Sequence, residues 1–293
     1  MDRERYIELI DKIIEEYFQT PEKERSLTKL YKKYGIKRQT LAKYIKAKGL
    51  PVINYTNIVK IDQTMFDVID TEEKAYWLGF MYADGNIAKN EDKIEMNLSV
   101  GDLDHMNKFK KFLKSEAKTR LCDNHGSIIC RFSVRNKHMW QALYDKGCVP
   151  AKSLILKFPP ENIFKHRNLI YDFIRGYCDG DGSLGIYFGK HGRKFQLSFC
   201  GTEEFLKGVE QFLGITGHIR NNSCNAYLSK ASTLYYNSRK ARAVSRLLYS
   251  NSTIYLDRKY DIYKMFCLAE EGSSVLKSSK IGRGWNANTE VTK

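Results

Sequence analysis

The sequence predicts an α+β protein in which two similar lobes follow a small, all-helical N-terminal domain. One observation is a repeated segment, because residues 77–85 and 173–182 both run through apolar residues to an Asp-Gly pair. A second is the alternation of apolar and polar residues after each copy, which is typical of half-buried strands. A third is the run from Arg25 to Lys48, which has nine basic residues and no acidic one. Together they predict a basic helical segment followed by a duplicated unit of helices and strands.

The N-terminal domain is expected to contain three helices. Apolar residues at helical spacing predict the first within residues 2–18, and a second short helix is predicted at residues 26–34. Gly35 then makes a turn into a third helix at residues 37–45.

This order of helices resembles a helix-turn-helix module. The resemblance implies that the third helix enters the DNA major groove with its first residues toward the base edges. The DNA-facing side chains would then be Lys37, Arg38, Gln39 and Lys43. Tyr31 departs from the pattern, since such modules usually place a small residue four positions before the turn glycine. The alternative is a basic three-helix bundle with a solvated face or a protein-docking role.

The repeated segments are predicted to be two helices that pack on each other. Gly79 and Ala83 in the first copy, and Gly176 and Gly180 in the second, are four residues apart. Residues at this spacing share one face of a helix. Side chains this small allow two helix backbones to pack directly, so a seam between the two copies is expected.

Two acids follow these stripes of small residues. Asp84 and Asp181 come at the predicted last turn of each helix, where the packing would bring their carboxylates together. Gly85 and Gly182 follow them, and we expect both to adopt the left-handed conformation that terminates a helix. A helix C-terminus carries partial negative charge, so this is an unfavourable place for two anions. A bound divalent metal ion would relieve the repulsion.

The residues after each copy predict the rest of a lobe. Alternation predicts a strand at residues 94–100 and its counterpart at 196–200, each followed by an amphipathic run. Further strands are expected, most clearly at 130–135 and also at 227–236. The second copy has extra residues, which we assign to a longer hairpin loop at 190–193. Each lobe is therefore predicted as helix, two strands, helix, two strands, helix.

Composition shifts divide the chain into five segments. Residues 51–64 lack clear periodicity and predict a linker, and the last residues are rich in Ser, Gly and Lys and predict a flexible tail. The expected order is a helical domain at 1–50, a linker at 51–64, a first lobe at 65–160, a second lobe at 161–271 and a tail at 272–293.

Composition also restricts the partner. The 293 residues include 49 Lys and Arg against 34 Asp and Glu, a formal charge of +15, which suits a polyanion such as nucleic acid. The seven cysteines form no Cys-x-x-Cys pair, which argues against zinc, and their odd number argues for reduced thiols. No glycine-rich phosphate loop occurs, and no apolar run reaches the roughly 18 residues that span a bilayer. We expect a soluble, cytoplasmic protein that acts on DNA in the same compartment and has no membrane partner.

The two repeated segments resemble the paired motifs of single-chain LAGLIDADG homing endonucleases. The penultimate Asp of each family motif falls on Asp84 and on Asp181. The resemblance implies two lobes side by side, each with a four-stranded antiparallel sheet, whose paired sheets form a saddle over the DNA major groove. It also implies a monomer in which the two Asp side chains bind Mg²⁺, with Mn²⁺ as a substitute, and cut both strands of a long asymmetric site.

Basic side chains should stand near these acids to offset the charge that develops on the phosphate. Lys152 and Lys259 match segments where similar endonucleases carry a lysine that supports cleavage, with Arg258 as the alternative to Lys259. The family commonly has a polar residue at the end of the second strand to hold a water, and Ser99 and Cys200 fall there. A thiol is a poor hydrogen-bonding substitute, which predicts asymmetric or slower cleavage of one strand.

The polar residues of the alternating strands would contact DNA bases if their apolar neighbours face the core. The alternative is an ordinary solvent-exposed strand face. The predicted base-contacting residues are Glu95, Asn97, Ser99, Arg131, Ser133, Arg135, Gln196, Ser198 and Cys200.

These features favour a site-specific, double-strand DNA endonuclease of the homing type. The alternatives are a transcriptional regulator or an intron-splicing maturase, in which the same fold binds DNA or RNA without cleaving DNA. The presence of both Asp84 and Asp181 argues against a regulator, which could lose either acid without penalty.

Overall fold

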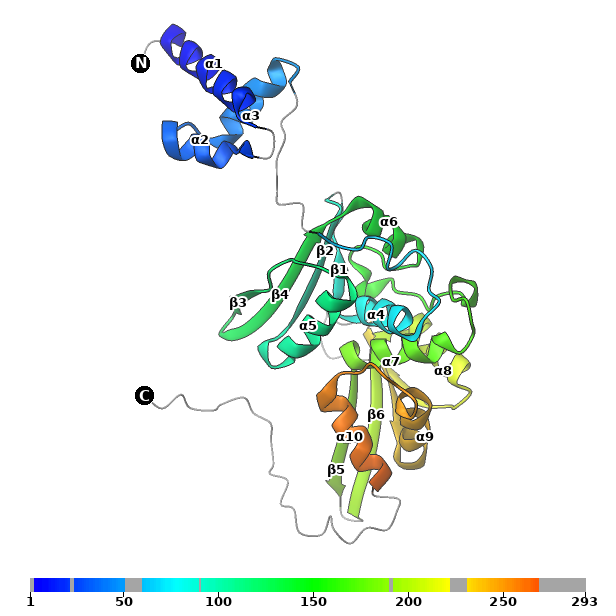
Figure 1. Cartoon of the computed structure of the whole chain (residues 1–293). Coiled ribbons are helices and arrows are strands. Elements are labelled where there is room, and N and C mark those ends of the chain that lie inside the picture. Colours follow the sequence, from blue (N-terminus) through cyan, green and yellow to red (C-terminus); the bar gives the residue numbers. More distant parts are fainter. Residues whose placement is uncertain are drawn as a thin grey trace, which may run out of the picture. The chain divides into compact units, whose positions relative to one another are not determined.

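The protein forms two compact units. The structure is a computed structural model that describes residues 3–21, 24–50, 60–89, 91–189, 192–221 and 231–268. One unit lies within residues 1–59, and the other begins at Lys60 (Figure 1).

The N-terminal unit is a bundle of helices, as predicted. It contains α1 (Arg3–Gln19), α2 (Leu27–Tyr34) and α3 (Arg38–Ala47). Ser26 accepts a hydrogen bond from the backbone N–H of Lys29 and caps the start of α2. Gly35 ends α2 in the left-handed conformation, at φ 71°, with its N–H donating to Tyr31 O. The predicted turn into α3 is therefore confirmed. The core of this unit is made by Ile10, Ile13, Ile14, Tyr17, Leu27, Leu30, Ile36, Leu41 and Ile45.

The second unit contains the predicted repeat. The first lobe is α4 (Glu72–Ala83), β1 (Gly85–Ile87), β2 (Lys93–Ser99), α5 (Leu103–Phe112), β3 (Arg120–Asn124), β4 (Ser127–Arg135) and α6 (Lys137–Asp145). The second lobe is α7 (Leu169–Asp181), β5 (Gly182–Gly189), β6 (Gly192–Thr202), α8 (Glu203–Leu213), β7 (His218–Asn221), β8 (Ala231–Asn237), α9 (Ser238–Tyr249) and α10 (Asp257–Leu268). Short 3₁₀ helices are η2 (Val100–Asp102), η3 (Lys152–Leu154) and η4 (Glu161–Ile163).

The two sheets have the same topology. Their strand orders are β1-β2-β4-β3 and β5-β6-β8-β7, and all neighbouring strands are antiparallel. The predicted α+β fold, with a four-stranded sheet in each lobe, is therefore confirmed. The apolar residues of the alternating strands are buried, as expected: Ile94, Met96, Leu98, Phe132, Val134, Leu197 and Phe199.

Helices α4 and α7 lie side by side between the two sheets (Figure 1). A Cβ atom on Gly79 would come within 1.9 Å of Phe173 O, and one on Gly176 within 1.9 Å of Tyr76 O. Such distances are far below van der Waals contact, so only glycine permits this approach of the backbones. The predicted seam of small residues is confirmed.

The predicted left-handed conformation of Gly85 and Gly182 is wrong. Gly182 has φ −98° and ψ 172°, and neither glycine has a positive φ. Instead, β1 and β5 begin at these glycines, so the chain passes from helix to strand without a left-handed residue. The glycines are needed for space, because a Cβ atom on Gly85 would lie 2.7 Å from the main-chain Cα of Met81 and one on Gly182 would lie 2.4 Å from Cys178 O.

Several predicted loop, linker and strand segments lie partly outside the described residues. Arg193, assigned to a loop, lies in β6, while residues 190–191 are outside the described residues. Residues 51–59 of the predicted linker, 227–230 of the predicted last strand and the tail at 272–293 also lie outside them. At the end of the predicted linker, the N–H of Asp62 donates to Leu113 O in the first lobe. Within the described residues, no helix is both long and apolar enough to cross a membrane.

Candidate active site

The seam ends at the two predicted acids. Asp84 is the C-terminal cap of α4, with its N–H donating to Phe80 O at 2.9 Å, and Asp181 is the last residue of α7. A Cβ atom on Gly180 would lie 3.3 Å from Asp84 Oδ2, so the Asp84 carboxylate lies against the last turn of α7. The packing of α4 and α7 therefore brings both acids to the same end of the seam.

The environment disfavours the charged form of both acids. Asp84 is half-buried, and burial, followed by the negative charge of Asp181, raises its pKa to about 6. The positive charges of Lys259, Lys152 and Arg258 act in the opposite direction. Asp181 keeps an exposed surface, yet partial burial of its carboxylate still raises its pKa, against the opposing charges of Lys152 and Lys259. Carboxylates in such a position would be stabilised by a cation.

Lys152 approaches the end of α4. It is the first residue of η3 and is half-buried, and its Nζ donates a hydrogen bond to Gly85 O, next to Asp84. Among the described residues, Gly85 O is the one hydrogen-bond acceptor that Lys152 Nζ contacts. An ammonium group has three N–H donors, so two are left for a ligand.

Lys259 holds the matching position at the end of α7. It lies in the first turn of α10 and is only 3% exposed. Its Nζ donates to Cys178 O at 2.7 Å, Asp179 O at 2.6 Å and Gly182 O at 2.7 Å, which uses all three of its N–H donors. Burial lowers the pKa of Lys259. Lys259 thus compensates the negative end of α7 from inside the protein.

The two lysines are equivalent within the repeat, because each binds the carbonyl of the glycine that follows an acid. Arg258, the alternative to Lys259, turns elsewhere, and its guanidinium binds the Asp102 carboxylate. Of these two basic residues of α10, the structure brings the ammonium group of Lys259 to the helix end.

The donor set suits a hard divalent cation. Asp84 and Asp181 offer carboxylate oxygens, the ligand type that Mg²⁺ prefers. Within the part of the chain that the structure describes, no cluster of three or more His, Cys, Asp or Glu side chains is placed to hold a metal. Two carboxylates fill only part of the coordination shell of Mg²⁺ and leave the other positions for water or a ligand oxygen, which matches the partial hydration that Mg²⁺ keeps in proteins.

The predicted base-contacting residues lie on the polar faces of the two sheets. Several pair within the sheet, since Arg131 Nε donates to Asn97 Oδ1 at 2.8 Å and Glu95 forms an ion pair with Lys93 at 2.7 Å. Gln196 Nε2 donates to Asn237 Oδ1 at 3.0 Å. Exposed members are Asn97, Ser99, Ser133, Arg135 and Cys200, and half-buried ones are Glu95, Arg131, Gln196 and Ser198.

Ser99 and Cys200 have different surroundings. Ser99 Oγ accepts a hydrogen bond from Gly101 N at 3.4 Å and caps the turn that follows β2. Cys200 lies opposite Thr233 in β8. Partial burial raises the pKa of its thiol, and the negative charge of Asp181 raises it further. Phe199, the neighbour of Cys200, pairs with Gly182, which follows Asp181, so Cys200 lies near that acid.

The sequence did not single out Asp179, a buried acid two residues before Asp181. Its Oδ2 accepts from Tyr76 Oη at 2.7 Å and from Leu256 N at 2.8 Å, and its Oδ1 accepts from Tyr249 Oη at 2.7 Å. Burial raises its pKa. The available signal was an Asp inside the apolar motif helix, where an unpaired charge would be costly.

In the N-terminal unit, Lys37, Arg38, Gln39 and Lys43 are all exposed. Tyr31, the departure from the helix-turn-helix pattern, is 46% exposed and lines a shallow hollow with the first three of these residues. Tyr31 therefore lies on the same surface as these basic side chains.

No protein-family model and no curated protein matches this chain. The solved structures that it resembles include three LAGLIDADG homing endonucleases. I-GzeII in complex with its DNA target is 14% identical, with a TM-score of 0.48 over 69% of this chain and 93% of that one. I-SmaMI bound to cleaved DNA is 10% identical, with 0.48 over 68% and 90%, and I-LtrWI bound to target DNA is 13% identical, with 0.45 over 69% and 92%. Similarity at this level transfers neither an activity nor a residue's role to this chain.

Proposed function

We propose that this protein is a site-specific DNA endonuclease that hydrolyses phosphodiester bonds where α4 and α7 end. One observation carries the proposal: two carboxylates meet at the ends of two packed helices, each beside a lysine bound to the next glycine carbonyl. The polar faces of the two sheets and a net charge of +15 support a DNA partner.

Asp84 and Asp181 would hold the metal ion, with Mg²⁺ as the expected cation and Mn²⁺ as a substitute. Such an ion, when bound, activates water and stabilises the attacking and leaving oxygens of an in-line displacement. Both Asp side chains must be ionised to act as ligands. The nearby lysines help by lowering the cost of that negative charge.

The lysines would act differently from each other. Lys152 has two N–H donors to offer a phosphate oxygen, so it can stabilise the charge that develops during cleavage. Lys259 has none to spare, so its contribution is to hold the end of α7 and Asp181 in place. We therefore assign a catalytic role to Lys152 and a positioning role to Lys259.

The target is expected to be long and asymmetric. In the first sheet β2 offers Lys93 and Glu95 where β6 of the second offers Gln196 and Ser198. Arg131 and Arg135 of β4 likewise have Thr233 and Asn237 as their counterparts in β8, so the two half-sites would favour different bases. Lys37, which precedes α3, and Arg38, Gln39 and Lys43 of α3 would extend the contact through a second element. Because one chain carries both halves of the site, a monomer is sufficient.

The test is incubation of the purified protein, Asp84→Asn and Asp181→Asn with a DNA library, with and without Mg²⁺. Sequencing of the new ends maps any cleavage, and a gel shift measures binding. Discrete Mg²⁺-dependent breaks made by the wild type alone would support the proposal, provided that the variants still bind. Specific binding without breaks would identify a regulator, and a preference for structured RNA would identify a splicing role.

A further inference from the structure

We propose that the first lobe positions Lys259 of the second lobe through three side chains, Glu72, Asp102 and Lys108, which we call the cross-lobe clamp. The proposal rests on the proposed function, in which Lys259 holds the end of α7 and Asp181. Lys259 lies in the first turn of α10, so its Nζ can stay at the end of α7 only if this turn is fixed.

Asp102 fixes one side of that turn. It belongs to η2 in the first lobe, and its carboxylate accepts from Arg258 Nε at 3.0 Å and from Arg258 Nη2 at 3.1 Å. Two parallel hydrogen bonds of this kind set the orientation of the guanidinium as well as its position. The Asp102 side chain is 13% exposed and that of Arg258 is 58% exposed, so the pair is partly shielded from water on the Asp102 side. The residue directly before Lys259 is therefore held by the other lobe.

Lys108, on α5 of the first lobe, fixes the start of α10. Its Nζ donates to both carboxylate oxygens of Asp257, at 2.8 and 2.9 Å, and to Tyr255 O at 3.3 Å. Asp257 is the first residue of α10. Together with Asp102, Lys108 restrains the two residues that precede Lys259.

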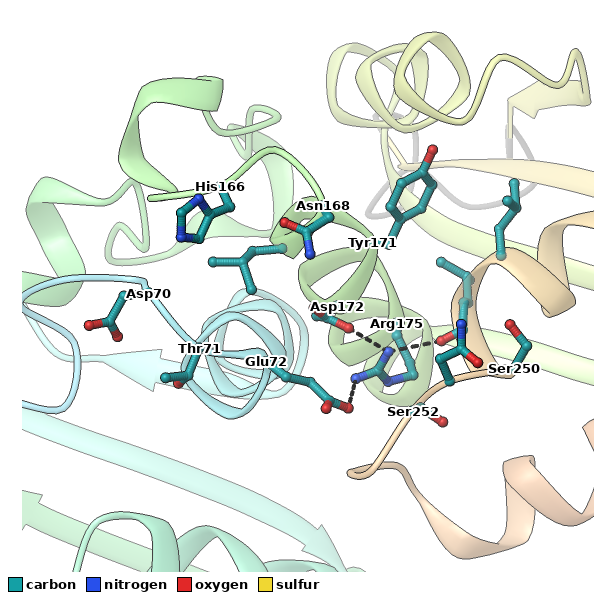
Figure 2. Close-up of a pocket in the computed structure, with 14 residues that line it drawn as sticks. Asp70, Thr71, Glu72, His166, Asn168, Tyr171, Asp172, Arg175, Ser250 and Ser252 are labelled. Carbon is teal, nitrogen blue, oxygen red and sulfur yellow. Dashed lines mark hydrogen bonds and ion pairs between the residues drawn. The ribbon is translucent and has the colours of Figure 1, made fainter.

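Glu72, the first residue of α4, fixes the loop that enters α10. Its Oε1 accepts from Thr253 N at 2.7 Å and Ile254 N at 3.3 Å, and its Oε2 accepts from Thr253 Oγ1 at 2.8 Å. Figure 2 shows how Glu72 in turn meets Arg175 of α7. Arg175 is 2% exposed and also donates to Ile254 O and Leu248 O, so this end of the clamp is anchored in the core.

The segment that carries Lys152 is held differently. Thr202, which corresponds to Asp102 in the repeat, donates from Oγ1 to Leu156 O. The ion pair between Lys157 and Glu204, at 3.1 Å, is exposed on both sides. An isolated exposed pair of this kind contributes little to stability. The Lys108–Asp257 pair is exposed as well, but Lys108 Nζ reaches both carboxylate oxygens and Tyr255 O and acts together with Asp102 and Glu72. Charged contacts across the lobes are thus concentrated on the Lys259 side, and loosening the clamp should slow cleavage of the one strand that this half-site serves.

The test uses a duplex of the mapped site with a different label on each strand. Lys259→Met and Lys152→Met first show which strand depends on which lysine. Asp102→Arg should then slow the Lys259-dependent strand by about tenfold or more, so that nicked DNA accumulates, while DNA affinity stays unchanged. Asp102→Asn should act in the same direction with a smaller effect. Combining Asp102→Arg with Arg258→Asp should restore the rate, because the pair is rebuilt with its charges exchanged.

Glu161→Gln is the matched control, since Glu161 pairs with Arg167 at 3.1 Å in an exposed contact that does not involve α10. Equal slowing of both strands, slowing of the Lys152-dependent strand alone, or no rescue by the exchanged pair would overturn the proposal. Hydrogen exchange of the peptide spanning residues 253–262 provides a readout that does not need cleavage. If the wild type cuts no DNA, the proposed function has failed, and the clamp is then judged by this peptide: Asp102→Arg must speed its exchange and the double variant must restore it.

Discussion

Replacing Asp84 by Asn should stabilise the metal-free protein while abolishing cleavage. The pKa of Asp84 is raised from 3.8 to about 6, first by burial and then by Asp181, so the folded protein resists the ionised form. Asparagine has a similar shape and no charge. It removes the ligand that the proposed metal needs and, with it, the cost of keeping that ligand ionised.

The size and sign of the effect follow from this shift. A rise in the pKa of Asp84 from 3.8 to about 6 corresponds to about 3 kcal/mol in the free energy of unfolding. Because the folded state binds the proton more tightly, the stability of the wild type falls as the pH rises from 3.8 to about 6. The stability advantage of Asp84→Asn over the wild type should therefore grow between pH 3.8 and about pH 6. It should reach its full value near pH 8 and disappear below about pH 3.5.

Urea unfolding in EDTA measures this difference. The fluorescence of Trp77 and Trp140 reports on the second unit, where both residues lie. The exposed Asp145→Asn is the control for loss of a surface charge. A gain for Asp84→Asn that is below about 1 kcal/mol at pH 8, or equal at pH 3.5 and pH 8, would show that folding does not raise the pKa of Asp84. Saturating Mg²⁺ should reduce the difference in the free energy of unfolding between Asp84→Asn and the wild type, because it stabilises only the wild type.

Three further outcomes are expected. The cleavage rate should rise with pH to a plateau above about pH 6, because Asp84 must be ionised to bind metal; a rate that is flat from pH 5 to 8 would contradict this. Gly176→Ala should lower the free energy of unfolding in urea by several kcal/mol, because its Cβ atom would lie 1.9 Å from a main-chain oxygen of α4. Gly101→Ala is the control: the nearest atom to its Cβ lies at 3.8 Å, so the loss should be under about 1 kcal/mol. Cys200→Ser should speed cleavage of one strand about fivefold, because a hydroxyl binds water better than a thiol and one hydrogen bond contributes about 1 kcal/mol. Cys122→Ser is the control, and a lower cleavage rate for Cys200→Ser would contradict a water-binding role at this position.

The features that could be predicted from the sequence depend on local spacing. Gly79 and Gly176 stand four residues from other small residues, which is sufficient to predict a face where two helices meet. Strand alternation likewise predicts the buried face, since side chains alternate sides along any strand. The geometry of Gly85 was missed because an Asp-Gly pair is compatible with both a left-handed turn and a direct passage into a strand. The contact of Gly85 with Met81, which excludes any Cβ atom, appears only in three dimensions.

The surroundings of the lysines were beyond sequence reasoning for a similar reason. Lys259 was predicted to stand near the acids, yet its burial and its bonds to the carbonyl oxygens of α7 depend on where α10 packs. The pair between Asp102 and Arg258 joins residues 156 positions apart, and the spacing of charges along a chain cannot match partners over that distance. Pairing of this kind follows from the tertiary fold alone.

The two half-sites share a backbone plan but compensate the charge at the helix end differently. At α7, Lys259 gives every N–H to main-chain oxygens, so part of the compensation is built into the folded protein. At α4, Lys152 binds only Gly85 O among the described residues and keeps donors for a ligand. The pKa of Asp84 stays at about 6 although the charges of Lys259 and Lys152 both lower it, so a bound cation would still favour its ionised form. A buried lysine on one side and an available one on the other would let the protein keep two carboxylates at two helix C-termini and still leave one cation free to meet a phosphate.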